Sequence, residues 1–83
     1  MENVLIEVFV PALELTFDAF IPLQSPMYEV LDLLKKAAME MSDGRFLADR
    51  TTAICHRENG RIININLSVY ELGVRNGSKL MLI

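Results

Sequence analysis

Cys55 and His56 are neighbours in the sequence, and their side-chain types could supply a nucleophile and a base. A thiolate activated by an adjacent imidazole is one arrangement for covalent catalysis. Both residues lie in a short apolar run that we predict to be a β-strand. Successive side chains of a strand point to opposite faces of a sheet, so the thiol and the imidazole would point apart. We therefore predict that Cys55 has a structural or surface role and is not a catalytic nucleophile.

The other residues that could do chemistry form no pattern that a known type of site requires. One cysteine and one histidine are too few for a zinc site, and the four glycines are isolated in turn-like segments, unlike a phosphate-binding loop. We expect no catalytic residue, no metal and no cofactor, and hence no enzymatic activity. No acid–base pair is expected among the scattered carboxylates, which include Glu2, Glu7, Glu14, Asp18, Asp32, Asp43 and Asp49.

Charge and composition exclude several classes of partner. The 83 residues carry a formal net charge of −3, and only Lys35 and Lys36 are adjacent among the eight basic residues. A nucleic-acid-binding surface would need a basic stripe. No apolar run approaches the ~18–20 residues of a membrane helix, so no direct membrane insertion is expected. A single cysteine fits a reducing compartment, so we expect a cytoplasmic protein. Eighty-three residues are enough for one small domain, which we expect to span residues 1–83.

The strands are predicted from period-two alternation of apolar residues. The first two strands are separated by a short turn and therefore form an antiparallel hairpin. Asn59-Gly60 predicts a second hairpin, whose tight turn needs positive φ at both positions. A short helical turn closed by Gly73 precedes the last strand. The five predicted strands span residues 3–10, 13–21, 52–56, 61–67 and 78–83.

A single helix is predicted over about residues 26–41. Ser25 is the expected N-cap, and Pro26 suits the first helical position. Gly44 is the expected C-cap. An apolar stripe at three- and four-residue spacing would cover a sheet; it consists of Met27, Val30, Leu31, Leu34, Ala38 and Met41.

These elements predict an α+β fold with a mixed sheet of four to five strands. The first and last strands are both strongly apolar, so we expect them to lie side by side in the middle of the sheet. The helix would cover one face and leave the other without a second layer.

The segment Leu72–Leu82 reads LGVRNGSKLML and resembles a pattern that is widespread in ubiquitin-like domains, L-G-V/I-x-x-G-S/D-x-L-x-L. Together with the N-terminal hairpin and the Ser25-Pro26 helix start, it makes nearly the whole chain similar to the ubiquitin-like β-grasp fold. The resemblance implies one helix packed on a mixed sheet with its first and last strands central.

Conjugated ubiquitin-like proteins and sulfur carriers of this fold end in a mobile Gly-Gly tail, whereas this sequence stops at Ile83, at the end of the last predicted strand. Its length and ending are most similar to the YukD/EsaB-like proteins, small ubiquitin-like components encoded with type VII secretion systems of Gram-positive bacteria. This resemblance implies a non-enzymatic, cytoplasmic accessory or regulator that binds protein components of a membrane-bound secretion machine. The alternative is a modifier or sulfur carrier whose Gly-Gly tail is absent from the sequence.

The strand pattern also predicts an exposed apolar patch on the sheet face that points away from the helix. Ubiquitin, which this chain resembles, likewise binds its partners through an apolar patch on the exposed face of its sheet. Exposed apolar clusters often mark partner surfaces, although burial in a homodimer or under loop 44–51 would also account for this one. Glu7, Arg57 and Arg75 would form a polar rim. The predicted patch consists of Leu5, Phe9, Cys55, Met81 and Ile83.

Overall fold

A β-hairpin forms the N-terminal part of this computed structural model, which describes residues 2–83. Strand β1 (Asn3–Val10) pairs antiparallel with β2 (Leu15–Pro22) along its whole length. The 3-10 turn η1 (Pro11–Leu13) joins them, and Glu14 closes it with a positive φ of 49°. The predicted hairpin is confirmed.

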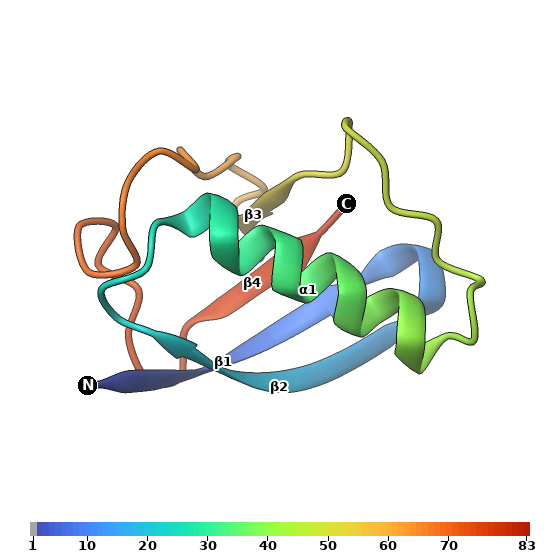
Figure 1. Ribbon diagram of the computed structural model, residues 1–83, viewed down its shortest axis with the longest axis horizontal. Coiled ribbons are helices and arrows are strands. Elements are labelled where there is room, and N and C mark those ends of the chain that lie inside the picture. The colour runs from blue at the N-terminus through green and yellow to red at the C-terminus, as the bar shows by residue number, and fades with distance from the viewer. Residues whose placement is uncertain (1) are drawn as a thin grey trace.

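The sheet has four strands in the order β2-β1-β4-β3 (Figure 1). Strand β4 (Lys79–Leu82) runs parallel to β1, and β3 (Ile54–His56) runs antiparallel to β4. The first and last strands are therefore central, as predicted. The pairing continues one step beyond the assigned strands, because Ala53 and Ile83 exchange backbone hydrogen bonds of 2.7 and 2.9 Å.

Helix α1 (Met27–Met41) crosses one face of this sheet (Figure 1). The prediction that Ser25 caps it was wrong, because Pro26 is the N-cap residue and no side chain caps the helix. Backbone carbonyls from a loop that is distant in sequence cap the helix instead. The N–H groups of Met27 and Tyr28 donate to the carbonyls of Leu67 and Ile65 at 2.8 and 3.0 Å.

The C-terminus of α1 ends in a Schellman motif. The N–H of Asp43 donates to Glu40 O and that of Gly44 donates to Met39 O, at 3.2 and 2.9 Å. Ser42 is the C-cap residue, so the prediction of Gly44 at that position was wrong. Asp43 takes the left-handed conformation with a φ of 53°, because short polar side chains tolerate it better than most.

The predicted strand at 61–67 is reduced to a single bridge between Cys55 and Ile62. Its start is held by hydrogen bonds from His56 N to Arg61 O and from Ile63 N to Ile54 O, both 3.0 Å. The chain then turns toward the start of α1. The carbonyls of Ile65 and Leu67 accept hydrogen bonds from the first N–H groups of the helix, so pairing with β3 does not continue. The connecting loop spans residues 57–60, and only Gly60 has positive φ, so the predicted two-residue turn was also wrong.

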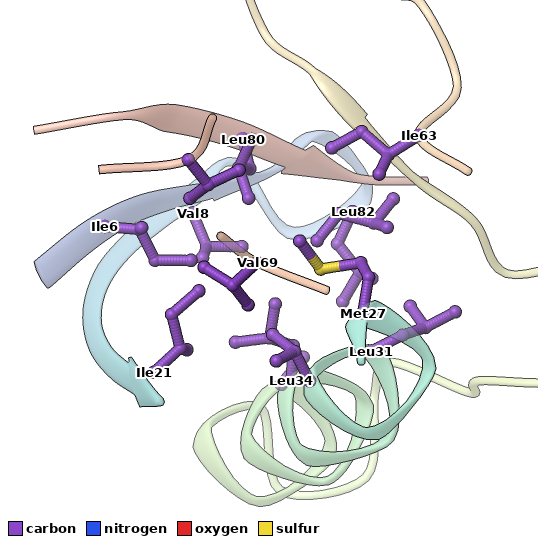
Figure 2. Close-up of a cluster of buried hydrophobic side chains, with 14 of the residues drawn as sticks. Ile6, Val8, Ile21, Met27, Leu31, Leu34, Ile63, Val69, Leu80 and Leu82 are labelled. Carbon is purple, nitrogen blue, oxygen red and sulfur yellow. The ribbon is translucent and has the colours of Figure 1, made fainter. Parts of the chain in front are cut away.

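The core lies between α1 and the inner face of the sheet (Figure 2). Alternate residues of β1 and β4 point into it, including Ile6, Val8, Leu80 and Leu82. The predicted helix stripe faces them except at Met41, which is exposed in the last turn. Phe46 from the following loop is buried in the core.

Candidate functional site

The outer face of the sheet is set by the same alternation that builds the core. Burial of Val8 and Val10 on β1 turns Phe9 outward, and burial of Leu80 and Leu82 on β4 turns Met81 outward. The parallel register pairs Phe9 with Met81, so these two predicted patch residues are neighbours on the central strands. Ile83 follows directly after β4, with 49% of its surface exposed.

Cys55 is on the predicted face but is fully buried, with 0% exposure. It is paired with Met81 on one side and Ile62 on the other, and both of these side chains are larger. Its Sγ lies 3.6 Å from the carbonyl oxygen of Met81. Cys55 therefore supports the patch from below and offers a partner no surface.

Burial also decides the chemistry of this thiol. Removal from water disfavours the thiolate and raises the pKa of Cys55. His56 follows it in β3, so their side chains leave the strand on opposite sides, as the sequence indicates. Within residues 2–83, no three His, Cys, Asp or Glu side chains gather in a way that could hold a metal ion.

Leu5 is separated from the rest of the predicted patch. The β1–β2 register sets Leu5 beside Phe20, which is 73% exposed. A row of charged residues lies between this pair and Phe9, since Glu7 is opposite both Asp18 and Lys79. With a rise of about 3.3 Å per residue, Leu5 and Phe9 are roughly 13 Å apart along β1. The predicted single patch is therefore two apolar areas.

The larger area, which we call the outer-face patch, consists of Phe9, Ile62, Met81 and Ile83. Ile62 is 70% exposed and was missed in the sequence, as was Phe20. The predicted two-residue turn at Asn59-Gly60 would pair Cys55 with Asn64, so only the observed four-residue loop sets Ile62 beside Cys55. The alternation of the second strand could have placed Phe20 on the outer face.

Arg57 borders the outer-face patch. Its guanidinium carbon lies 4.4 Å from the centre of the Phe9 ring, and its Nη1 lies 3.2 Å from Oε2 of Glu7. Each contact is worth at most about 1 kcal/mol on a half-exposed surface. Together they hold a cation against the edge of the apolar area, where the sequence predicts a polar rim.

No protein-family model matches the sequence, and no curated protein is similar to it. Several solved structures match over the full chain. The EccD5 ubiquitin-like domain from Mycobacterium xenopi superposes with a TM-score of 0.82 at 17% identity, covering 100% of this chain and 94% of that one.

Two further structures come from the same kind of system. The ubiquitin-like domain of the Mycobacterium tuberculosis type VII secretion protein EccD1 gives a TM-score of 0.80 at 18% identity, covering 100% of this chain and 99% of that one. A chain of an ESX-5 inner membrane complex gives 0.70 at 15% identity, covering 100% of this chain and 21% of that one. At these identities the likeness shows the fold alone, and that fold is the ubiquitin-like β-grasp.

Proposed function

We propose that this protein is a non-enzymatic interaction module that docks on a larger component of a type VII secretion system. The observation that carries the proposal is the outer-face patch, where Ile62 and Ile83 are 70% and 49% exposed beside Phe9 and Met81. Monomeric proteins rarely expose such apolar groups together unless they bind something. The likeness to EccD ubiquitin-like domains supports secretion as the setting.

The proposed mechanism is recognition without bond making. The outer-face patch would form the apolar centre of an interface, and Arg57 with Glu7 would lie in its polar rim. Within residues 2–83, no helix is both long and apolar enough to span a bilayer. We propose that the protein acts in the cytoplasm as an accessory of the YukD/EsaB-like kind, bound to a membrane component that supplies the anchor.

Met81→Asp tests this proposal, because it sets a charge in the middle of the patch. The binding partner is the purified type VII membrane complex encoded in the same genome, immobilised for interferometry. We expect at least a tenfold loss of affinity, since an unpaired carboxylate would be desolvated at the contact. Leu33→Asp is the matched control, because Leu33 is exposed on α1, away from the outer face of the sheet. The affinity of this variant for the complex should stay within twofold of the wild-type value.

Equal affinity of the wild-type protein and Met81→Asp for the complex would refute the patch as the docking surface. Sedimentation of the protein alone provides the second readout. A wild-type dimer that Met81→Asp dissociates would show that the patch is covered by a second copy, which contradicts the proposal.

A further inference from the structure

A polar cleft of about 720 Å³ lies next to the outer-face patch. One wall is the start of loop 57–60 together with His56, and the other is the loop that leads from Gly73 into β4. Arg57 belongs to both surfaces, because it lines the cleft while its guanidinium lies over Phe9. The cleft and the patch are therefore continuous.

The cleft is rich in positive charge. Arg57, Arg75 and Lys79 line it, with His56 beside them, and Glu58 is the one carboxylate among the lining residues. Among residues 2–83 the only ion pair joins Arg57 to Glu7. Arg75 and Lys79 thus have no carboxylate within 4.0 Å in the described part of the chain, and their charges are available to a ligand.

This concentration of cations contrasts with the rest of the molecule. Residues 50–83 contain five of the eight basic residues and two of the eleven acidic ones. Residues 1–49 contain the other three basic and nine acidic residues. The chain has an overall charge of −3, yet residues 50–83 carry a net charge of +3, and the cleft itself is lined by three cations and one carboxylate. A cleft of one sign on a protein of the other sign steers ligands of opposite charge toward that one place.

We propose that the cleft binds an acidic segment of the partner protein, with carboxylates at Arg75 and Lys79 and an apolar side chain on the outer-face patch. This inference rests on the proposed docking function and adds the chemistry of the partner. The continuity of cleft and patch favours a peptide, because it allows charged and apolar contacts in one extended segment. Nucleic acid fits poorly, since three cations neutralise few phosphates and the remaining surface is acidic.

The test uses the acetylated hexapeptide ELEELE as a probe, titrated into the ¹⁵N-labelled protein at 50 mM salt. We expect saturable shifts at the amides of Arg57, Arg75 and Lys79, with affinity falling as salt is raised to 500 mM. The double variant Arg75→Glu/Lys79→Glu should bind at least tenfold more weakly. The matched control Lys35→Glu/Lys36→Glu makes the same change in net charge on α1 and should stay within about threefold.

Several outcomes would overturn the inference. These are an absence of saturable shifts, an equal loss of affinity in both double variants, and tighter binding of a 12-nucleotide single-stranded DNA. Saturation by orthophosphate alone at the same amides would show a simple anion site and would also overturn it. Thermal melts check that both double variants fold.

The same variants separate this inference from the docking proposal. Suppose that Arg75→Glu/Lys79→Glu binds the secretion complex as well as the wild type does, while Met81→Asp does not bind it. The proposed acidic segment at the cleft is then refuted, and the proposed docking through the outer-face patch is kept. Suppose instead that the peptide binds the cleft, while neither the wild-type protein nor any variant binds the secretion complex. The proposed docking on a secretion component is then refuted.

Discussion

At the residue scale, Arg57 is the side chain that links the two surfaces. It touches an aromatic ring of the apolar patch, pairs with Glu7 and lines the basic cleft. No local pattern reveals this, because Glu7 and Phe9 lie about fifty residues earlier in the chain. The sequence indicates a charged rim, and only the fold shows which atoms form it.

Cys55 gives a prediction for the pH dependence of stability. Burial raises the pKa of this thiol above its ordinary value of 9.0. As the pH rises past 9, the unfolded chain loses the thiol proton first and then binds fewer protons than the native chain. The free energy of unfolding therefore falls with pH, and the contribution of the thiol is fully present only below pH 9.

Urea unfolding from pH 7 to 10.5 measures this effect, with Cys55→Ala as the comparison. The wild-type protein should lose stability more steeply than Cys55→Ala above pH 9, and the two slopes should agree below it. Parallel curves over the whole range would mean that the thiol titrates alike in the folded and unfolded chains.

At the scale of elements, the sequence predicts what depends on local patterns and misses what depends on distant contacts. The apolar period of α1 and the alternation in β1 and β4 are local, so the helix, the hairpin and the central strands were predictable. The capping of α1 was not, because its first N–H groups bond to the carbonyls of Ile65 and Leu67, about forty residues later. The same contacts explain why the expected strand at 61–67 shortens to one bridge.

The β1–β2 turn carries a strained residue that offers a second stability prediction. Glu14 has a φ of 49°, in a region that costs most L-residues about 1–2 kcal/mol. Glycine removes this cost but loses more backbone entropy on folding. We expect Glu14→Gly to raise the free energy of unfolding by roughly 0.5–1 kcal/mol, which a thermal melt would show as a few degrees.

Glu14→Ala serves as its control, since alanine keeps the side-chain Cβ and hence the strain. Its melting temperature should stay near that of the wild type. A Glu14→Gly protein no more stable than Glu14→Ala would show that the turn is not strained at this residue.

At the scale of the whole molecule, the described residues 2–83 place one helix on a four-stranded sheet and leave the second sheet face without a layer (Figure 1). The sequence predicts this arrangement and the central position of the last strand. It also places Leu5, Phe9, Met81 and Ile83 on the outer face of the sheet, but it misses Phe20 and Ile62 there. The division into two apolar areas was not predicted, because the division depends on strand register. The basic cleft was missed, since its cations are dispersed in the sequence and converge only when β4 pairs with both β1 and β3.

Mapping the bound surface by NMR tests the central claim, that the outer face of the sheet docks on a protein partner. The ¹⁵N-labelled protein is titrated with the soluble domains of the proposed partner, a type VII membrane complex. We predict that amide shifts and broadening concentrate at Phe9, Ile62, Met81 and Ile83, and spare the exposed side of α1 around Leu33. Changes centred on α1 or on the free edge of β2, with the outer-face patch unperturbed, would contradict the account.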